Sequence, residues 1–287
     1  METFRTRAGR RLAFRREGSG PALVCHPGGP GFSGRELGDL AGLADTLTLI
    51  VLDPRGTGGS DPPGDPSAYA LDDFASDLDE LRVHLELERM SILGYSHGGL
   101  VAMRYASTRP ERVERLVLAA TLARLGAAQQ EEYGRMMLVR NGEPWYGEAV
   151  AALEAEERGD FETPEDLERL CLAMAPMYFA RWDERARALV EEATEIGNVE
   201  ALRLFNADPP DLTPELGRIT APTLVIAGEQ DFICGPASAR ELSARIPDSR
   251  LVLLADAGHW VFFEESERFA ASVRQFLSSS VAAPTTA

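Results

Sequence analysis

The chain has 287 residues and a formal net charge of −17 at pH 7, and all 29 of its basic residues are arginines. Its length allows one large α/β domain or two small ones, and so acidic a surface repels phosphate backbones, which excludes nucleic acid as a partner. The three cysteines, Cys25, Cys171 and Cys234, lack metal-ligand spacing and favour free thiols in a reducing compartment. There is no bilayer-spanning apolar run and no signal-peptide pattern, so we expect a cytoplasmic protein that does not bind membranes.

Strand and helix patterns alternate along most of the chain. Residues 3–14 predict a hairpin that turns at Gly9. Apolar runs predict strands at 22–25, 47–52, 90–94, 115–120, 223–228 and 250–254, and helical patterns fall at 72–87, 97–108, 236–245 and 264–278. This alternation predicts an α/β fold in which helices cover both faces of a mostly parallel sheet.

A glycine-rich loop follows the first strand after the hairpin. Residues 25–31 read Cys-His-Pro-Gly-Gly-Pro-Gly, with three glycines where a plain tight turn would need one. Without side chains the backbone can approach a ligand closely. A free N–H of Gly29, or of Gly28, can therefore help to hold developing negative charge.

The most informative motif is Gly94-Tyr95-Ser96-His97-Gly98, a match to G-x-S-x-G. A bare match can be an ordinary glycine-rich turn, but this one lies between a predicted strand and a predicted helix, as a nucleophile elbow requires. The turn leaves no room for side chains at Gly94 and Gly98, and it lifts the Ser96 hydroxyl clear of the sheet edge. Ser96 is therefore the candidate nucleophile, and the backbone N–H of His97 is a second candidate oxyanion donor.

A serine nucleophile needs a histidine base. Of the four histidines, His84 lies in a predicted helix, His97 points away at the elbow, and His26 lies in the glycine-rich loop. His259 follows the predicted strand at 250–254, at the edge of the sheet that carries the elbow. His259 is therefore the candidate base, the alternative being a loop histidine packed beside Trp260.

The acid that orients the base should lie between the serine and the histidine in the chain. Asp231 does so, directly after the strand predicted at 223–228. Glu229 is close enough in sequence to compete for this role, and Asp256 lies nearer to the histidine but shapes its own loop. Asp231 can also be an ordinary turn aspartate.

The alternation breaks between residues 123 and 212, which are rich in Glu, Ala, Arg and Leu. We expect a helical cap here, inserted after the sixth core strand, with residues 1–122 and 213–287 forming the core domain. Aromatic residues of the cap can line an apolar pocket, although most will pack in the cap's own core. They are Tyr133, Trp145, Tyr146, Tyr178, Phe179, Trp182 and Phe205, of which Trp145 and Tyr178 are our candidate substrate contacts.

The motifs together resemble the α/β-hydrolase fold superfamily, and within it the prolyl iminopeptidase-like branch. The resemblance rests on residues 26–31, on Asp53-Pro54-Arg55-Gly56-Thr57-Gly58-Gly59-Ser60 and on the elbow. It departs from the family where Pro27 interrupts the usual His-Gly-Gly-Pro-Gly and where His97 replaces a frequent Trp. Asp53 and Arg55 are expected to brace their loop.

The resemblance also implies how a substrate would be held. A prolyl iminopeptidase must bind the free amino terminus of its substrate, and the family uses cap glutamates for this purpose. Glu195 and Glu200 lie near the matching place, although most glutamates of the cap will be solvated.

Our leading hypothesis is a serine hydrolase that removes N-terminal residues, preferably proline, from small peptides or amides through an acyl-enzyme. The first alternative is a carboxylesterase or lactonase acting on a small apolar ester, and the second is a non-catalytic binding protein of the same fold. None of these functions needs a cofactor or a metal, and we expect neither. The expected partner is a small-molecule or short-peptide substrate.

Overall fold

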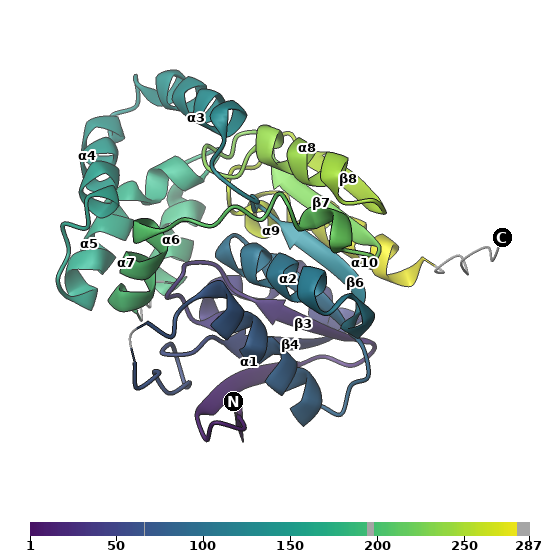
Figure 1. Ribbon diagram of the computed structural model, residues 1–287. Coiled ribbons are helices and arrows are strands. Elements are labelled where there is room, and N and C mark those ends of the chain that lie inside the picture. The colour runs from purple at the N-terminus through teal and green to yellow at the C-terminus, as the bar shows by residue number, and fades with distance from the viewer. Residues whose placement is uncertain (66, 194–197, 280–287) are drawn as a thin grey trace.

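The computed structural model describes residues 1–65, 67–193 and 198–279, and eight strands form one twisted sheet (Figure 1). The strands are β1 (Glu2–Arg5), β2 (Arg11–Glu17), β3 (Ala22–His26), β4 (Thr48–Asp53), β5 (Met90–Tyr95), β6 (Val113–Ala119), β7 (Thr223–Gly228) and β8 (Ser249–Leu254). Their order across the sheet is β1-β2-β4-β3-β5-β6-β7-β8. The predicted α/β fold is thus confirmed.

The sheet is antiparallel at one edge and parallel elsewhere. β1 and β2 form the predicted hairpin, in which Glu2 pairs with Phe14, and β2 runs antiparallel to β4. From β4 through β3, β5, β6 and β7 to β8, every neighbouring pair is parallel. The carboxyl ends of these strands therefore meet at one edge, where ligands bind in open α/β sheets.

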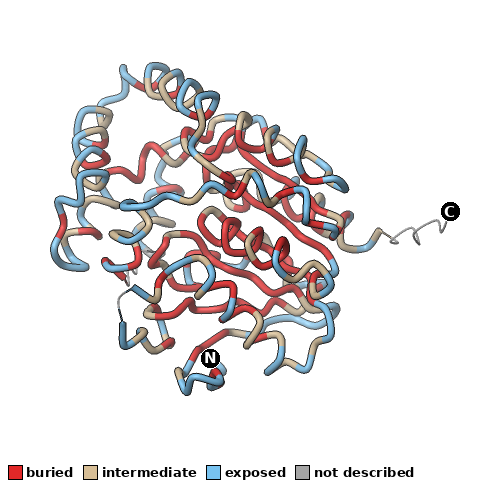
Figure 2. Tube along the Cα trace, viewed as in Figure 1, coloured by how far each residue is buried: buried red, intermediate tan, exposed pale blue. Residues whose placement is uncertain are grey.

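Helices cover both faces of the sheet, and a separate apolar core lies under each layer (Figure 2). One face carries α1 (Leu71–His84), α2 (His97–Thr108) and α8 (Pro236–Arg245) over side chains such as Phe74 and Leu100. The other carries α9 (Val261–Glu264), α10 (Ser266–Ser278) and the short 3-10 turns η1 (Gly34–Leu37) and η2 (Leu40–Asp45). Burial on both faces explains why the parallel strands are almost continuously apolar.

Two predicted helices differ from those observed. The helix predicted at 264–278 is interrupted at Glu265, which leaves the helical backbone (φ −118°, ψ 54°) and accepts a hydrogen bond from the Asp256 N–H. The helix predicted at 72–87 ends at His84, because the chain turns at Glu86 with φ 55°. Both breaks depend on local backbone geometry that the apolar pattern does not register.

Within the described residues, five α-helices lie between β6 and β7 and form the cap, coloured teal to green in Figure 1. They are α3 (Ala127–Arg140), α4 (Tyr146–Glu157), α5 (Pro164–Met174), α6 (Glu184–Ala193) and α7 (Val199–Ala207). The cap has small apolar clusters of its own, one around Met136, Leu153 and Met177. The insertion after the sixth strand is as predicted, and the division into two domains at 122 and 213 stays a prediction.

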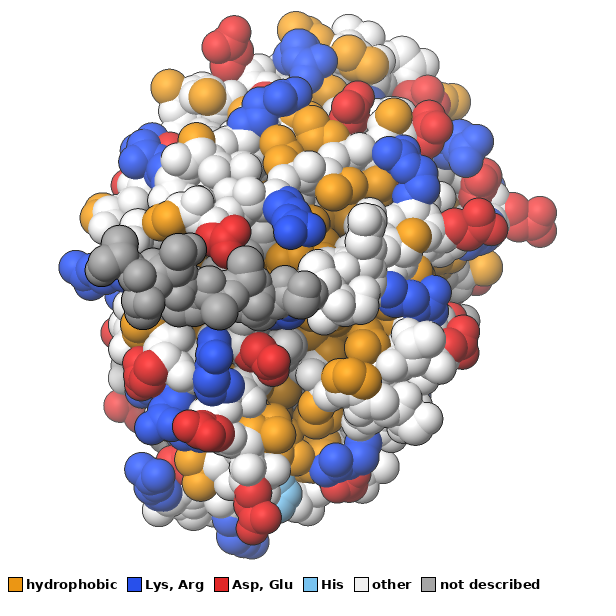
Figure 3. Space-filling model, turned by 90° about the vertical axis from the view of Figure 1, so that its right-hand side faces the viewer, with side chains coloured by type: hydrophobic (Ala, Val, Ile, Leu, Met, Phe, Trp, Pro, Cys, Tyr) orange, Lys and Arg blue, Asp and Glu red, His pale blue; other side chains and the backbone are white. Residues whose placement is uncertain are grey.

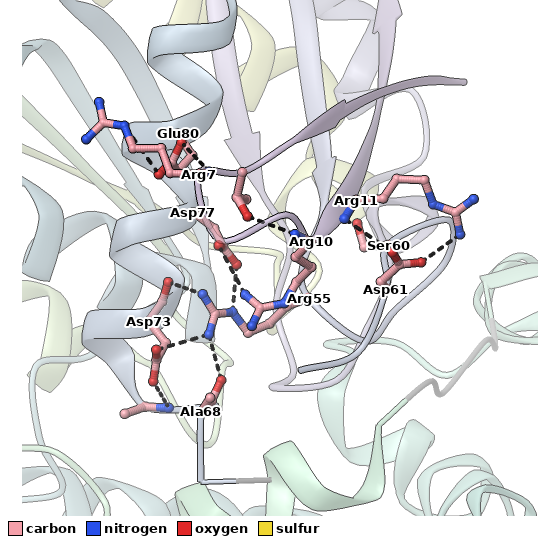
Figure 4. A network of polar contacts seen from close by, with 12 residues as sticks. Arg7, Arg10, Arg11, Arg55, Ser60, Asp61, Ala68, Asp73, Asp77 and Glu80 are labelled. Carbon is pink, nitrogen blue, oxygen red and sulfur yellow. Dashed lines mark hydrogen bonds and ion pairs between the residues drawn. The ribbon is translucent and has the colours of Figure 1, made fainter. Parts of the chain in front are cut away.

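The glycine-rich loop after β4 is held by a buried ion pair between Arg55 and Asp77 and by hydrogen bonds (Figure 4). The Arg55 guanidinium donates to Asp77 Oδ2 at 2.6 Å and to the carbonyl oxygens of Ala68 and Asp73 at 2.7 Å each. Asp53 accepts hydrogen bonds from the N–H groups of Gly34 and Gly59. These contacts agree with the bracing role expected of Asp53 and Arg55.

The surface carries charges of both signs. On the face drawn in Figure 3, arginine and acidic side chains are interspersed over the described residues, with apolar side chains between them. No described helix is long and apolar enough to span a bilayer.

Candidate active site

Ser96 lies at a sharp turn between β5 and α2, at the carboxyl edge of the sheet. Its backbone has φ 52° and ψ −120°, a conformation that residues other than glycine rarely adopt. The turn is held because the Ser96 N–H donates to the Ala119 carbonyl at 3.0 Å and the Thr121 hydroxyl donates to the Ser96 carbonyl at 2.7 Å. Such strain at a cavity wall is typical of a nucleophile elbow.

The glycines of the motif are required by close backbone contacts. A Cβ at Gly94 would overlap the carbonyl oxygen of Gly98, and one at Gly98 would overlap the carbonyl oxygens of His26 and Pro27. No side chain fits in either place. The turn is therefore as tight as the motif predicted.

The predicted acid and base lie in hydrogen-bond contact. His259 Nδ1 donates to Asp231 Oδ2 at 2.7 Å, and the Asp231 side chain is fully buried. Asp231 Oδ1 accepts from the N–H groups of Ile233 and Cys234 at 2.9 and 3.0 Å, which fix the carboxylate in its loop. The competing carboxylates, Glu229 and Asp256, are exposed.

Asp231 and His259 stabilise each other's charged forms. Burial alone would raise the pKa of Asp231, but the charge and hydrogen bond of His259 outweigh burial and lower that pKa below 3.8. Burial alone would lower the pKa of His259, but the charge and hydrogen bond of Asp231 outweigh burial and raise that pKa above 6.5. The imidazole can therefore take a proton while Asp231 stays ionised.

The remaining histidines differ from His259. Burial lowers the pKa of His26 to about 4 and that of His97 to about 3, so both rings are neutral at pH 7. The His97 ring packs edge-on against Phe205 of the cap and against Phe74. His84 stacks on Phe4 at the far hairpin. None of these three rings makes a hydrogen bond to a carboxylate within the described residues.

The two candidate oxyanion donors are available. Gly29 has φ 103°, which favours glycine, and neither its N–H nor that of His97 donates a hydrogen bond to a described residue. Both residues line the cavity that contains Ser96. The N–H of Gly28 is instead occupied, because it donates to Glu36 Oε2 at 2.6 Å. Gly29 is therefore a better candidate oxyanion donor than Gly28.

Glu36 is a buried carboxyl group that the sequence analysis did not single out. It lies in η1, is 8% exposed, and lines the cavity beside Ser96. Burial raises its pKa to about 7, while the Gly28 hydrogen bond and the charge of His259 act in the opposite direction. A lone glutamate in a polar loop has no sequence feature that distinguishes it from a solvated one.

A cavity of about 520 Å³ lies between the sheet edge and the cap, a size typical of small-molecule sites. Its wall is mostly apolar, with side chains such as Leu122, Met174 and Trp260. Three carboxylate residues also line it, Glu36, Glu156 and Glu157, whereas no arginine does within the described residues. The cavity therefore offers carboxyl groups and no described arginine, although burial raises the pKa of Glu36 and of Glu156.

Of the candidate substrate contacts in the described residues, one lines the cavity and two do not. Tyr178 lines the cavity, and its ring lies 5.5 Å from that of His259. Trp145 packs in the core of the cap and is not among the residues lining the cavity. Glu200 also lies outside the lining, with its side chain 53% exposed and paired with Arg203 at 3.2 Å. Glu195 lies outside the described residues.

Glu264, also missed from the sequence, ties the histidine loop to the cap. Its Oε2 accepts the Gly258 N–H at 2.7 Å, and its Oε1 accepts the N–H groups of Ala180 and Arg181 at 2.8 and 3.3 Å. Beside it, the His259 N–H donates to the Tyr178 carbonyl at 2.7 Å. The position of His259 thus depends on the cap.

Glu264→Ala should lower both stability and turnover. It leaves three backbone N–H groups without their acceptor, which should reduce the free energy of unfolding by about 1–3 kcal/mol. It should also lower kcat several-fold, because the His259 loop loses its anchor. Denaturant unfolding and steady-state kinetics measure the two effects, with exposed Glu267→Ala as control. Wild-type values for both quantities would refute this role of Glu264.

Asp231, Cys234 and His259 form the one described group with metal-ligand proximity, their ligand atoms lying within 4.8 Å of one another. Burial raises the pKa of the Cys234 thiol well above 9, which keeps the sulfur protonated and a poor ligand. The Asp231 oxygens already accept three hydrogen bonds. These three residues are therefore better suited to form the Asp231–His259 hydrogen bond than to bind a metal ion.

Comparison with known proteins places the chain in a family. The sequence profile described as the alpha/beta hydrolase fold matches residues 21–266. The chain therefore belongs to the alpha/beta hydrolase fold family, and it is a hydrolase. It is 30% identical over 269 residues to a proline iminopeptidase from Lactobacillus helveticus, covering 90% of each chain. The resemblance to the prolyl iminopeptidase-like branch is thus confirmed.

Two solved structures have the same fold. One is the enol-lactonase from Burkholderia xenovorans LB400, at 26% identity and a TM-score of 0.74, with 97% of this chain and 100% of that chain covered. The other is an esterase from Exiguobacterium antarcticum, at 21% identity and a TM-score of 0.77, with 96% and 99% covered. The second likeness concerns the fold alone.

Proposed function

We propose that this protein is a serine hydrolase that works through an acyl-enzyme and releases N-terminal residues, preferably proline, from small peptides or amides. The observation that carries the serine-hydrolase assignment is the constellation at one sheet edge. A strained Ser96 and the buried Asp231–His259 pair lie in loops after three parallel strands. Its peptidase specificity is supported by the carboxyl groups that line the cavity and by the relatives named proline iminopeptidase.

In the proposed reaction, Ser96 Oγ attacks the substrate carbonyl while His259 Nε2 takes its proton. The N–H groups of Gly29 and His97 hold the charge that develops on the carbonyl oxygen. His259 then gives the proton to the leaving amine, and the acyl-enzyme forms. Water hydrolyses the acyl-enzyme by the same route, with His259 as base. Asp231 holds the imidazole by Nδ1 and stabilises its charged form.

The carboxyl groups that line the cavity support a free-amine substrate. An ammonium group that enters an apolar cavity loses its hydration and needs a carboxylate partner. The described lining offers Glu36 from the core and Glu156 and Glu157 from the cap. Glu156 is held by Asn206, whose side chain donates to its Oε1 at 2.8 Å. Glu195 and Glu200 stay candidates only from the family resemblance.

A comparison of three substrates tests this specificity. We expect kcat/KM for a proline arylamide with a free amine to exceed that of its N-acetylated form by at least about tenfold, because only the first carries the cation. A short acyl ester carries no amine, so its hydrolysis measures the activity of Ser96, His259 and Asp231 independently of amine binding. Equal rates for the free and blocked arylamides would contradict the peptidase specificity.

A carboxylesterase or lactonase is the second candidate. It is favoured by the largely apolar wall of the cavity and by the likeness to an enol-lactonase, and it uses the same serine chemistry. Rapid ester or lactone hydrolysis without cleavage of either arylamide would support this candidate over the peptidase.

Activity should rise with pH. His259 must be neutral to act as base, and its pKa is raised above 6.5, so kcat/KM for an ester should increase through a midpoint above that value. An ester substrate is used because it has no amine to titrate. In Glu36→Gln the rise should persist with its midpoint at lower pH, because the Glu36 charge helps to raise the pKa of His259. A flat profile from about pH 5 to about pH 9 would contradict this role of His259.

A further inference from the structure

Glu36 has the features of a cation-binding residue. Its carboxyl group is buried against the glycine-rich loop, where the Gly28 N–H is its one hydrogen-bond donor among the described residues. No described arginine pairs with it. A buried carboxylate without a cation is unfavourable, which is consistent with its raised pKa.

The carboxyl group of Glu36 lies close to the nucleophile. A Cβ placed on Gly28 would be 3.0 and 3.1 Å from the two Glu36 carboxylate oxygens and 3.1 Å from Ser96 Cβ. Glu36 and Ser96 therefore flank the same glycine, at a separation that a single substrate residue can span. Both line the cavity of about 520 Å³ under the cap, and Tyr95 and Trp260 line it with them.

The surroundings suit an organic cation. Pro30, Phe32 and Trp260 form an apolar and aromatic wall near the glycine-rich loop and His259. An ion pair against such a wall is stronger than the same pair in water. The Tyr95 hydroxyl is buried and has no hydrogen-bond partner among the described residues, so a polar group of a ligand can still pair with it. Beside Ser96 the cavity thus offers the Glu36 carboxyl group, the unpaired Tyr95 hydroxyl and an apolar surface to a ligand.

We propose that Glu36, a residue of the core and not of the cap, binds the amino group of the substrate residue whose carbonyl Ser96 attacks. This inference rests on the proposed function and specifies its amine site. The substrate ammonium group neutralises the Glu36 carboxylate. Without it, that carboxylate would repel the negative charge that develops on the substrate oxygen at the Gly29 and His97 N–H groups. An uncharged ester gains nothing from this contact, so Glu36 selects for free amines.

The decisive variant is Glu36→Gln, which keeps an oxygen acceptor for the Gly28 N–H and removes the charge. At about pH 7.5, we expect the ratio of kcat/KM for the free-amine proline arylamide to that for its N-acetylated form to fall at least tenfold. Ester hydrolysis should be faster, because loss of the Glu36 charge lowers the pKa of His259. Glu156→Gln makes the same change in the cap, and exposed Glu148→Gln is the matched control.

A second measurement needs no amide cleavage, and its first comparison uses the wild type alone. Pyrrolidine, which is a cation at this pH, should inhibit ester hydrolysis by the wild type, whereas tetrahydrofuran, its uncharged analogue, should inhibit far less. Glu36→Gln should remove most of the difference between the two compounds. Equal inhibition of the wild type by both would overturn the proposal, even if the variant failed to fold.

The outcomes separate this inference from the proposed function. An amine preference that survives in Glu36→Gln but is lost in Glu156→Gln would overturn the assignment to Glu36 and leave the peptidase function standing. Inhibition by pyrrolidine that depends on Glu36, in an enzyme that cleaves no proline arylamide, would support the cation site and refute the peptidase function.

Discussion

Ser96→Ala should lower kcat by at least about a thousandfold on every substrate, because no other group at the elbow can form the acyl-enzyme. The residual rate would come from oxyanion and substrate binding alone. The change removes one oxygen that makes no hydrogen bond with a described residue, so the melting temperature should stay close to that of the wild type. Steady-state kinetics and thermal unfolding measure the two quantities.

The matched control is Ser272→Ala, on α10 and outside the cavity lining, which should keep wild-type turnover. Near-wild-type turnover by a folded Ser96→Ala protein would refute the proposed mechanism. The buried thiol of Cys25 would not replace the serine, since burial raises its pKa to about 12 and keeps it protonated.

Asp231→Asn should lower kcat by roughly three to four orders of magnitude, as the corresponding change does in well-studied serine proteases. The asparagine has no charge to stabilise the protonated imidazole, and its amide can hold His259 in the wrong tautomer. Asp231 is fully buried and accepts two further N–H groups, so some loss of stability should accompany the loss of rate. Single-turnover kinetics isolate the acylation step.

Glu229→Gln provides the comparison, because Glu229 lies two residues away, precedes the same loop and is exposed. We expect it to have little effect on kcat. A large loss in Glu229→Gln together with wild-type turnover in Asp231→Asn would reverse the assignment of the acid.

Most of the fold could be predicted from the sequence, because its signals are local. Strands buried on both faces leave continuous apolar runs, and β7 and α2 lie at the residues predicted for them. The elbow motif is likewise a local signal, although the backbone that leaves no room for a side chain at Gly98 belongs to His26 and Pro27 of another segment. Asp231 and His259 could be paired in advance because adjacent parallel strands end at one edge.

The breaks at Glu86 and Glu265 could not be predicted from that pattern. Each depends on one residue's backbone angles, and Glu265 is held in place by the Asp256 N–H from another segment. The apolar positions on either side still follow the helical period. Periodicity therefore located these helices but not where they end.

By itself the sequence determined the fold and the candidate nucleophile, base and acid of this protein, whereas only the tertiary structure decided which carboxylates face the cavity. Glutamates occur throughout the cap, and their burial depends on the elements packed against them. Glu200 lies against solvent and Glu156 against the cavity, although both belong to helices of the cap. Glu36 and Glu264 acquire their positions from backbone N–H groups of other segments, at Gly28, Ala180 and Gly258. Only the contact of Ala180 with Glu264 joins distant parts of the chain, but none of the three follows a helical or strand period.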